Sequence, residues 1–482
     1  MKISILSPNL SGDPSIIDIG ITYLATYINE RTTHSARILD FTYHARDWRK
    51  HLARHIEQHR PDVIGVSSVS MYMQYIKPML VEIKARWDLP IILGGYHATL
   101  MPEPTIALPE VDAVCIGDGE YPLTEWLDAL EAGRSGHGIR GLWFKDGDAV
   151  VRNELRELNQ DIDSLPIPDY DLWEDLERFL FYNGVIYVIG NRGCPYGCTY
   201  CSEQPLRERM PGRYLRTRDP VAYAREIEHH YAKYRHRGMR VAHTFDPAFT
   251  VNLPWLEAFS AAYQEIGLAT ELPYSCFSRA DQLDEHKVKL LADSNAGVVR
   301  IGIESGNERI RSEVYHKPIP DAQYRKVIAL LHQHGIVVTG YNILGGPGES
   351  MSTMRDTFRF VRELEVDRPI FFTYRPLPAT RAAELVAELG GHIDQDAWEK
   401  IDSLHQHSNV YTQDLSPRQI AAYRYRCLVH FTSRRMLRMA RQQRGAFVGN
   451  LARYLVHGAR DGIGMQYALG YFMVSGGDNV VS

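Results

Sequence analysis

Three cysteines of this chain lie within eight residues, at Cys194, Cys198 and Cys201, and their spacing is C-x3-C-x2-C. The chain has six cysteines in all, so half of them are concentrated in this one segment. Three thiolates on a short loop can bind three irons of a [4Fe–4S] cluster, whose full protein ligand set is four cysteines. A structural zinc site normally requires four ligands, and His229 and His230, the next histidines, lie well downstream. The spacing therefore favours a cluster with one open iron.

The cysteine motif carries an aromatic residue, Tyr200, directly before its third cysteine. With this residue the motif resembles the radical S-adenosylmethionine (radical SAM) superfamily, and the resemblance extends over roughly residues 1–385. It implies that the open iron binds the amino and carboxylate groups of SAM and that Tyr200 lies against the adenine. It also implies that reductive cleavage of SAM yields a 5′-deoxyadenosyl radical, with electrons from a donor such as flavodoxin or ferredoxin.

The bulk composition is that of an ordinary globular enzyme: 482 residues, 44% hydrophobic, 23% charged and a net charge of −5. This length accommodates two or three domains. No apolar run reaches the roughly 18–20 residues that a membrane span requires, and residues 1–6 look like a first strand, not a cleavable signal. Because unpaired cysteines and an oxygen-sensitive cluster suit a reducing compartment, we expect a cytoplasmic enzyme. We expect a small-molecule substrate and no nucleic-acid partner.

Residues 1–135 alternate strand and helix patterns with short connections. We expect strands at 2–7, 36–41, 62–67, 90–95 and 113–117, and helices at 20–30, 48–58, 72–86 and 122–132. Apolar runs such as residues 63–66 are typical of a parallel sheet covered on both faces. The pattern predicts a doubly wound, Rossmann-like domain, which binds ligands at the carboxyl ends of its strands.

Glycines and small polar residues gather at those strand ends. The set comprises Ser67, Ser70, Gly94, Gly95, His97, Gly117, Gly119 and Glu120. Glycine lets the backbone approach a bulky ligand, whereas the dinucleotide pattern G-x-G-x-x-G is absent after the first strand.

The segments at 19–25, 94–99 and 117–120 resemble the cobalamin-binding domain that precedes many radical SAM cores. The resemblance implies base-off cobalamin held by this set of residues. The D-x-H-x-x-G motif that supplies a cobalt ligand elsewhere is missing, and Asp40 with His44 does not reproduce it. Some family members lack a cobalt-binding histidine, and others keep the domain without binding cobalamin. His97 can equally be a histidine that caps a strand end.

Residues 136–185 read as an extended linker, because two prolines at 166 and 168 stand among acidic and aromatic residues. A second β/α series then occupies residues 186–385, with strands expected at 186–190, 241–245, 272–277, 298–303, 337–343 and 370–374. Six such units predict a partial (β/α)6 barrel, whose site lies at the C-terminal ends of its strands.

Polar residues follow these strands in the order that the radical SAM resemblance implies. Asp246 is expected to accept a hydrogen bond from the SAM ammonium, and Arg279, next to Ser278, to pair with the SAM carboxylate in a bidentate way. Glu304 and Ser305 are expected to bind ribose hydroxyls or the ammonium, and Leu344 to line the adenine. In the loop after the sixth strand, Ala379 replaces the glycine of the family's Pro-Gly-Thr, so we expect that backbone to differ.

The region 386–482 reads as helical and rich in arginine. Residues 416–460 contain ten arginines and no acidic residue. Such a surface can meet an anionic substrate, make weak peripheral contact with an anionic membrane, or pair with acidic patches of the same chain. Its aromatic residues suit a sizeable, partly apolar or sugar-like substrate, or simple packing. They include Trp398, Tyr411, Tyr423, Tyr425 and Phe431.

The leading interpretation is cobalamin-dependent methylation of an sp3 carbon of a small-molecule or natural-product substrate. The alternative is a radical dehydratase, isomerase or cyclase, for example one that deoxygenates an aminosugar, with a vestigial cobalamin domain. In that case Tyr214 and Glu203 are candidate proton donors. A third hypothesis, a non-catalytic cobalamin or SAM sensor, conflicts with the intact cysteine motif, because a sensor does not need an open iron.

The other three cysteines are interpreted as structural. Cys276 lies near a predicted strand end, where it can approach the substrate or act as a small buried apolar residue. The second interpretation is favoured. Cys115 falls within a predicted strand, and Cys427 within the arginine-rich helical region.

Overall fold

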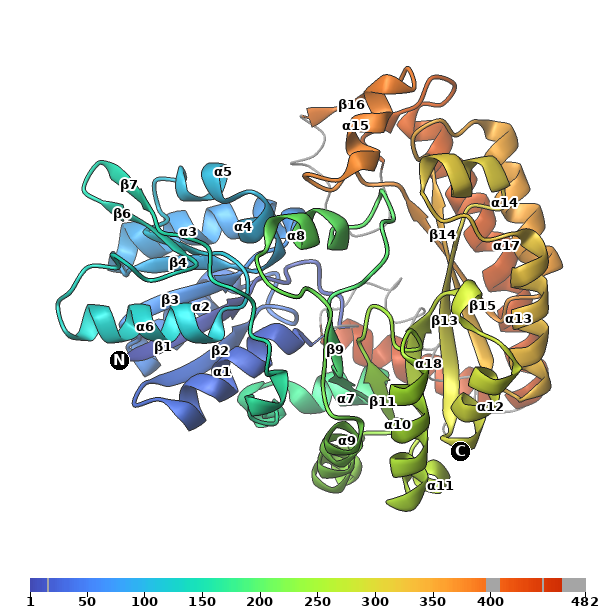
Figure 1. The fold of residues 1–482 in the computed structure, drawn as a ribbon, viewed down its shortest axis with the longest axis horizontal. Coiled ribbons are helices and arrows are strands. Elements are labelled where there is room, and N and C mark those ends of the chain that lie inside the picture. Colours follow the sequence, from blue (N-terminus) through green and yellow to red (C-terminus); the bar gives the residue numbers. More distant parts are fainter. Residues whose placement is uncertain (15–16, 396–407, 444–445, 462–482) are drawn as a thin grey trace. The chain divides into compact units, whose positions relative to one another are not determined.

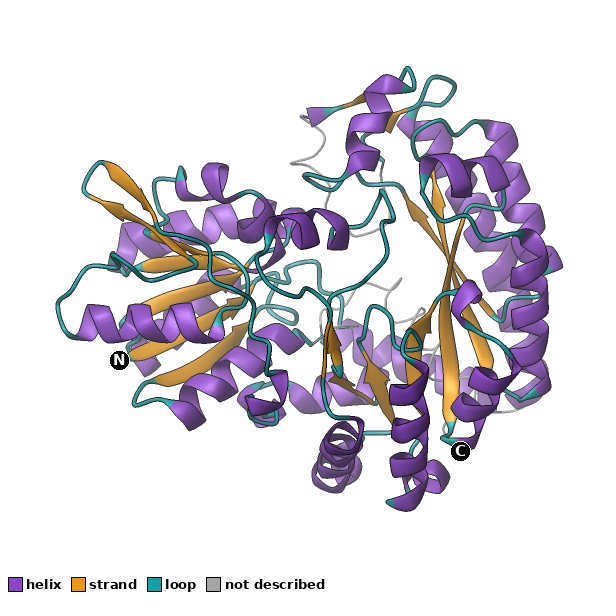
Figure 2. Cartoon of the chain, in the orientation of Figure 1, coloured by secondary structure: helices purple, strands orange, loops and turns teal. Residues whose placement is uncertain are grey.

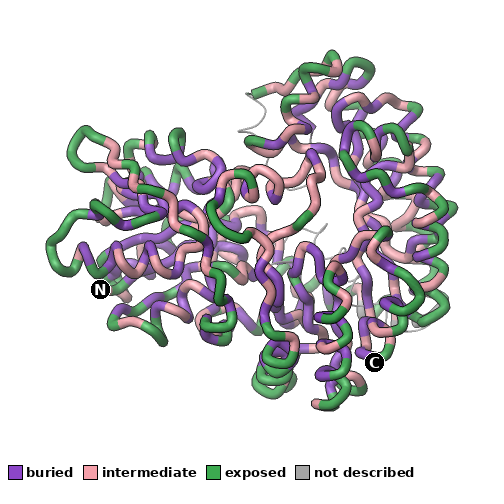
Figure 3. The backbone as a smooth tube through the Cα atoms, viewed as in Figure 1, coloured by how far each residue is buried: buried purple, intermediate pink, exposed green. Residues whose placement is uncertain are grey.

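The computed structural model describes residues 1–14, 17–395, 408–443 and 446–461 (Figure 1). The chain forms two compact units. The first unit comprises Met1–Phe179, Pro205–Tyr214 and a segment that starts at Leu455, and the second comprises Leu180–Gln204 and Leu215–Tyr454. In each unit the strands are mostly buried, and the outward sides of the helices are exposed (Figure 3).

The sheet of the first unit has seven strands in the order β2-β1-β3-β4-β5-β6-β7. Five are parallel: β1 (Lys2–Ser7), β2 (Ser35–Asp40), β3 (Val63–Ser67), β4 (Ile91–Gly94) and β5 (Ala113–Cys115). The last two, β6 (Leu142–Asp146) and β7 (Ala149–Arg152), pair antiparallel. The five parallel strands lie where the sequence predicts them, within three residues at either end.

Helices cover both faces of this sheet (Figure 2). The longer ones are α1 (Ile19–Arg31), α2 (Trp48–His59), α3 (Met73–Trp87) and α6 (Glu120–Glu131). α2 and α3 share one core cluster with the strands, through residues such as Leu52 and Ile76, while α1 contacts α6. The Asp18 carboxylate caps α1 by accepting a hydrogen bond from Ile21 N, 3.0 Å away. The predicted doubly wound α/β domain is confirmed.

Two features of this unit differ from the sequence-based expectation. The glycine-rich segment after β4 forms two short helices, α4 (Gly95–Leu100) and α5 (Pro102–Ile106), and is not a plain loop. The compact unit also continues to Phe179, beyond the boundary predicted at residue 135. Within the expected linker, the β6–β7 hairpin at Leu142–Arg152 extends the sheet.

The rest of the expected linker also packs on the first unit. Trp173 is 2% exposed, and its Nε1 donates a hydrogen bond to Thr22 Oγ1 at 2.9 Å. The backbone N–H of Asp169 donates to Thr26 Oγ1 at 2.8 Å. Burial of a tryptophan and satisfaction of its N–H stabilise this segment against α1, which the local proline-rich composition does not reveal.

The second unit contains a six-stranded, all-parallel sheet in the order β15-β14-β13-β12-β11-β8. Its strands are β8 (Val185–Val188), β11 (Val241–Thr244), β12 (Tyr274–Ser278), β13 (Ala296–Glu304), β14 (Val337–Leu344) and β15 (Arg368–Thr373). Consecutive strands are neighbours, as in one sector of a (β/α) barrel. The predicted partial (β/α)6 barrel is therefore confirmed.

Five helices connect these strands: α9 (Pro220–Tyr234), α10 (Leu253–Glu265), α12 (Glu285–Asp293), α13 (Asp321–Gln333) and α14 (Met351–Glu363). Four of them begin at residues whose side chains accept backbone hydrogen bonds, as N-caps do: Asp219, Asn252, Asp284 and Ser350. The sequence places each of these caps directly before its helix.

The C-terminal region covers the open edge of this sheet. The helix α17 (Pro417–Gln443) contacts the edge strand β15. Arg424 Nε donates to the carbonyl of Phe371 at 2.8 Å, and the rings of Phe371 and Phe431 are 5.5 Å apart. A covered edge strand has fewer unpaired backbone groups. Phe431 thus packs the outside of the barrel, Tyr425 is 69% exposed, and Trp398 lies outside the described residues.

The helical region is interrupted by a small sheet. Before α17 come α15 (Arg381–Glu388) and the antiparallel pair β16 (His392–Ile393) and β17 (Val410–Tyr411), and after it comes α18 (Ala446–Arg460). Arg438 on α17 pairs with Asp367 at 3.9 Å, which is a contact within the chain. Among the described residues no helix is long and apolar enough to cross a membrane.

The loop after β15 adopts a backbone conformation that favours glycine, although it contains alanine. Ala379 has a φ of 60°, in the left-handed region. The next residue, Thr380, is the N-cap of α15, and its Oγ1 donates to Leu377 O at 2.7 Å. The expected difference from the family's Pro-Gly-Thr loop stays a prediction.

Replacing Ala379 with glycine is expected to stabilise the second unit. The left-handed conformation costs a non-glycine residue about 1–2 kcal/mol, and the greater freedom of glycine in the unfolded chain removes roughly 0.4–1 kcal/mol of that gain. We expect the thermal unfolding midpoint of Ala379→Gly to rise by about 1–3 °C. The control is Ala387→Gly, an exposed site within α15, where glycine should lower the midpoint. A lower midpoint for Ala379→Gly would contradict the assignment of strain.

Candidate active site

The three cysteines lie on the loop that follows β8, in the second unit. The loop begins at Gly190, where a Cβ atom would stand 2.9 Å from the Tyr223 ring, so only glycine fits between the loop and α9. Next comes β9 (Asn191–Arg192), paired antiparallel with β10 (Arg216–Thr217). Tyr223 and the loop are also joined through Asp246, whose two carboxylate oxygens accept from Gly190 N at 2.9 Å and Tyr223 Oη at 3.2 Å.

Thr199, between the second and third cysteines, fastens the loop to two distant segments. Its Oγ1 donates to Val314 O at 2.6 Å, and its N–H donates to Tyr315 O at 3.3 Å. Its carbonyl accepts from the N–H of Ala382 in the first turn of α15, at 2.9 Å. Thr199 is 1% exposed. The position of the cysteines is therefore set by hydrogen bonds that satisfy a buried loop residue.

The three cysteine side chains are neither disulfide-bonded nor fully buried. Burial raises the pKa of the Cys194 thiol to about 11 and that of Cys201 to about 12, so iron has to displace the protons when it binds. Arg279 Nη1 donates to Cys198 Sγ at 3.4 Å. Three accessible thiols beside a cation suit an anionic iron–sulfur cluster.

Arg279 is held in place by neighbours from its own strand end and from the cluster loop. Its Nε and Nη2 donate to the two carboxylate oxygens of Asp281, at 3.0 and 2.8 Å, and its guanidinium lies 3.8 Å from the centre of the Tyr196 ring. The sequence predicts that Arg279 pairs in a bidentate way with the SAM carboxylate. In this structure its bidentate partner is the Asp281 carboxylate. Contact between Arg279 and the SAM carboxylate remains a prediction.

Tyr200, Glu304 and Lys317 form a buried polar network at the end of β13. Tyr200 Oη donates to Glu304 Oε1 at 2.8 Å, and Lys317 Nζ donates to the same oxygen at 2.8 Å. Glu304 has a φ of 65° and follows a register shift in β13. A Cβ at Gly302 would collide with Glu304 and Lys317. The sequence analysis did not predict a role for Lys317, because no motif near this lysine identifies it as the partner of Glu304.

Other predicted SAM contacts are buried and already bonded in this structure. Asp246 is 0% exposed, and burial raises its pKa to about 7. Ser278 Oγ and Thr250 Oγ1 are 2.6 Å apart, and Ser305 Oγ accepts from Asn307 N at 3.2 Å. Ser305 and Leu344 are 0% exposed. These side chains position the strand ends, and direct SAM contacts by them remain predictions.

The remaining candidate residues are the other three cysteines and the two candidate proton donors. Cys276 and Cys427 are 0% exposed and Cys115 is 5% exposed, which agrees with structural roles. Glu203 is 9% exposed and begins α8 (Glu203–Arg209). Tyr214 packs against the core of the first unit, and its role as a proton donor remains a prediction.

In the first unit, the predicted cobalamin residues gather at the carboxyl ends of β3, β4 and β5. Ser67, Ser70, Gly94, Gly95, His97, Gly117 and Gly119 are all partly exposed there. Ser70 Oγ and His97 Nδ1 are 2.9 Å apart, and burial lowers the His97 pKa to about 4, so the imidazole is neutral near pH 7. Hydroxyl, imidazole and backbone amide groups on an accessible edge suit the amides and phosphate of cobalamin.

The reason for two of these glycines is internal packing. Gly95 has a φ of 89°, and a Cβ there would stand 2.9 Å from Ser68 O. Gly117 has a φ of 88°, and a Cβ there would stand 2.5 Å from Met210 Cε. Glu120 is only 4% exposed in the first turn of α6, and its contact with cobalamin remains a prediction.

Comparison with known families decides what these two sites are. Residues 11–127 match the B12 binding domain, and residues 188–361 match the Radical SAM superfamily. The chain is a radical SAM enzyme with an N-terminal B12-binding domain. The cofactors of this family are a [4Fe–4S] cluster, SAM and cobalamin. The accessible thiols of the second unit and the polar edge of the first fit them.

Three similar proteins illustrate how far the resemblance extends. An uncharacterized methyltransferase of Pyrococcus horikoshii is 28% identical over 372 residues, covering 76% of this radical SAM enzyme and 77% of the relative. The anaerobic magnesium-protoporphyrin IX monomethyl ester cyclase of Cereibacter sphaeroides is 26% identical over 339 residues, covering 68% of this chain and 54% of the cyclase. This chain therefore spans about half the length of the cyclase.

A solved structure supports the fold of both units. The radical S-adenosylmethionine methyltransferase TsrM from Kitasatospora setae, with cobalamin and a [4Fe–4S] cluster bound, matches with a TM-score of 0.67 at 19% identity. The match covers 82% of this chain and 77% of TsrM. At this identity the likeness concerns the fold.

Substituting Thr199 tests the anchoring of the cluster loop. Thr199→Val removes the hydrogen bond to Val314 O with little change of shape, and a buried carbonyl left unsatisfied costs about 1–3 kcal/mol. We expect faster loss of iron to a chelator and a lower iron content after reconstitution. Thr199→Ser, which keeps the hydroxyl, is the matched control and should retain its iron. Equal iron loss in wild type and Thr199→Val would contradict this role.

Proposed function

We propose that this radical SAM enzyme is a cobalamin-dependent methyltransferase acting on an sp3 carbon of a small-molecule substrate. The observation that carries the proposal is the presence in one chain of a B12 binding domain and a three-cysteine loop. The names of the similar proteins from Pyrococcus horikoshii and Kitasatospora setae support methyl transfer.

When bound, the cluster and SAM supply a carbon-centred radical, and cobalamin supplies a methyl group. The residues of the chain hold and orient these groups. Thr199 holds the cysteine loop in position through its hydrogen bonds, and Arg279 places a positive charge beside Cys198. Tyr200 presents an aromatic face, and its hydroxyl is fixed by Glu304.

The electron donor and the location belong to the same proposal. We propose flavodoxin or ferredoxin as the donor, because cleavage of SAM needs an electron. A cytoplasmic location is supported by the state of the cysteines, all six of which are free. The contact between Arg438 and Asp367 supports pairing within the chain for part of the arginine-rich helix, and weak membrane contact through its exposed arginines remains a proposal.

A cyclase, dehydratase or isomerase is the second candidate. The observation that favours it is the 26% identity to the magnesium-protoporphyrin cyclase of Cereibacter sphaeroides. Glu203, beside Cys201 at the start of α8, is the candidate acid or base for this alternative.

Cofactor content and the fate of the methyl group separate the two candidates. After anaerobic reconstitution with iron, sulfide and hydroxocobalamin, we expect bound cobalt near one equivalent. With a reductant and SAM carrying a deuterated methyl group, we expect S-adenosylhomocysteine and the deuterated methyl label in the cobalamin fraction. Elemental analysis and mass spectrometry provide the measurements.

The controls use the cysteines. Cys194→Ala should lose the cluster, while Cys427→Ala, at a buried site away from the motif, should keep it. Iron without bound cobalt and without label transfer would contradict methyl transfer and favour the second candidate. A cluster retained in Cys194→Ala would overturn the assignment of the site.

A further inference from the structure

Every strand of the second unit's sheet contributes a large side chain to one face of the sheet. Successive ring centres are 5.3–5.9 Å apart from Tyr187 through His243, Phe277 and Tyr341 to Phe372. On β13 the corresponding residue is Arg300, whose guanidinium lies 5.8 Å from the centre of the Phe277 ring. Tyr187, His243, Phe277, Tyr341 and Phe372 come from β8, β11, β12, β14 and β15.

This face is the inner one. Phe371, the neighbour of Phe372, packs against Phe431 of α17 on the outside, and successive strand residues point to opposite faces. Along β13, Val299 and Ile301 are fully buried, whereas Arg300 between them is partly exposed. Phe277, Tyr341 and Phe372 are partly exposed as well. The inner face is therefore accessible to a ligand.

Arg300 has no carboxylate partner among the described residues. Its Nη1 donates to Tyr341 Oη at 2.9 Å, and its Nε is buried without a hydrogen bond. By contrast, the fully buried Arg311 donates to Ser305 O and Ile319 O and pairs with Asp321. Arg300 therefore loses part of its hydration without a carboxylate to compensate for the loss. The planar guanidinium of arginine is well suited to bind a carboxylate or a phosphate at such a place.

The depth of Arg300 defines the length of the ligand. Arg300 precedes Glu304 by four residues on β13, a rise of about 13 Å along the strand. Glu304 hydrogen-bonds Tyr200 of the cysteine motif. A ligand that reaches from Arg300 to the strand ends would span this distance along a wall of aromatic rings.

We propose that this inner face binds a substrate with one anionic group, a carboxylate or a phosphate, on an aromatic or otherwise apolar body. The Arg300 guanidinium binds the anion through charge-assisted hydrogen bonds. This assignment depends on the proposed function in one respect, which is that the ligand is the substrate of the radical reaction.

Calorimetric titration of the reconstituted holoenzyme tests this assignment. The probes are phenylacetate, phenyl phosphate and the neutral phenylacetamide. We expect at least one of the two anions to bind about tenfold or more tightly than phenylacetamide, and to lose that advantage in Arg300→Gln. Preference for phenylacetate or phenyl phosphate distinguishes the two kinds of anion. The control Arg438→Gln removes an arginine of α17 that is 65% exposed and should bind as wild type does.

Three outcomes overturn the proposal: neither anion binds, the amide binds equally well, or Arg300→Gln retains the preference. Thermal unfolding provides a second readout, because Arg300→Met should leave the midpoint unchanged or raise it if the charge serves a ligand, and lower it if the charge is structural. No SAM turnover is required, so failure of methyl transfer and failure of this assignment are distinguishable.

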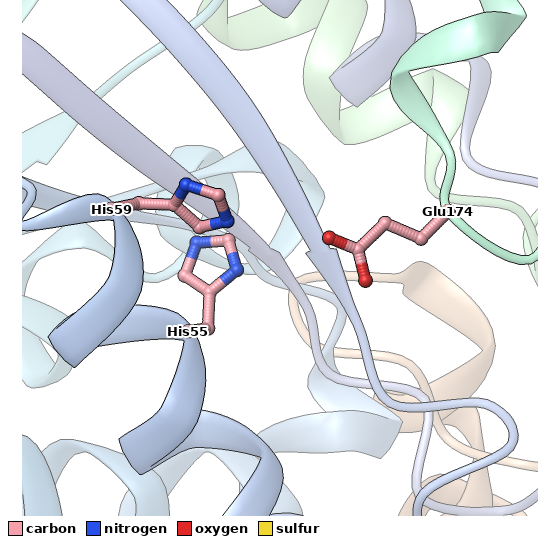
Figure 4. Close-up of side chains that lie close together, drawn as sticks. All are labelled: His55, His59 and Glu174. Carbon is pink, nitrogen blue, oxygen red and sulfur yellow. The ribbon is translucent and has the colours of Figure 1, made fainter.

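A separate cluster of side chains lies in the first unit. His55 and His59 are four residues apart on α2 and face the same side, and Glu174 comes from the segment that follows the 3₁₀ turn Tyr170–Leu172. One potential ligand atom of each lies within 4.8 Å of the others. Figure 4 shows the Glu174 carboxylate pointing toward the two imidazole rings.

The chemistry of these groups suits a metal ion. His55 Nε2 is 2.8 Å from Ser4 Oγ, which leaves Nδ1 as the ligating atom, and metal-bound histidines usually bond a second group in this way. His59 Nε2 is buried without a hydrogen bond among the described residues. Glu174 is exposed and free to approach by the small distance that coordination needs.

We infer that His55, His59 and Glu174 bind a divalent cation of the zinc class, with water as the fourth ligand. The ion ties the segment around Glu174 to α2 and stabilises the first unit. Three protein ligands with mixed nitrogen and oxygen atoms favour Zn²⁺ over Mg²⁺ or Ca²⁺.

Titration with Zn²⁺ and Co²⁺ tests this site in the full chain carrying Cys194→Ala, Cys198→Ala and Cys201→Ala, which removes the competing thiolates. We expect one equivalent of metal, visible absorption of four-coordinate Co²⁺, and about tenfold or greater loss of affinity in His59→Gln and Glu174→Gln. His34→Asn is the control, because His34, Asp128 and Glu131 form another candidate group. Unchanged binding in His59→Gln, or no binding at all, would overturn the site. If the triple variant does not fold, zinc content is measured in the cobalt- and iron-loaded holoenzyme and in its His59→Gln variant. We expect less zinc in the variant, and equal zinc content would overturn the site.

Discussion

The geometry of the cysteine site depends on how one buried loop residue satisfies its polar groups. A loop at the end of a strand has no ladder to bond its N–H and C=O groups, and buried groups of this kind must find partners. Thr199 finds three, in Val314, Tyr315 and Ala382. Two of these follow β13 and the third begins α15, so the loop is correctly placed only when the barrel and the start of the C-terminal region have folded.

Charge placement in the second unit distinguishes structural groups from functional ones. Arg279 is paired with Asp281, Lys317 with Glu304, and Arg311 with Asp321. In each pair the partner compensates for the desolvation of the charge. Arg300 shares the same environment without such a carboxylate, and it is surrounded by aromatic rings that are partly exposed. The contrast within one sheet, not the burial of any single group, is what assigns Arg300 to a ligand.

The first unit is larger than its parallel strands suggest. The β6–β7 hairpin adds two antiparallel strands at one edge, and the segment that contains Trp173 and Glu174 packs back on the helices. Both additions bury apolar or amphipathic side chains that the parallel core leaves uncovered. The polar edge at the ends of β3, β4 and β5 stays accessible, and this is the edge at which doubly wound folds bind ligands.

The sequence by itself determined the local features: eleven parallel strands from their apolar runs, four helices of the first unit from their patterns, and the three cysteines from their spacing. These depend on residues that are close together along the chain. Only the tertiary structure decided which polar residues meet. It paired Arg279 with Asp281 and Glu304 with Lys317, and it buried Asp246, Ser305 and Glu120. It also packed Tyr214 against the core of the first unit and left Arg300 without a carboxylate partner, among the described residues, on the inner face of the barrel. Such pairings join residues from different strands and loops. The local sequence therefore does not predict which distant side chain will compensate a buried charge.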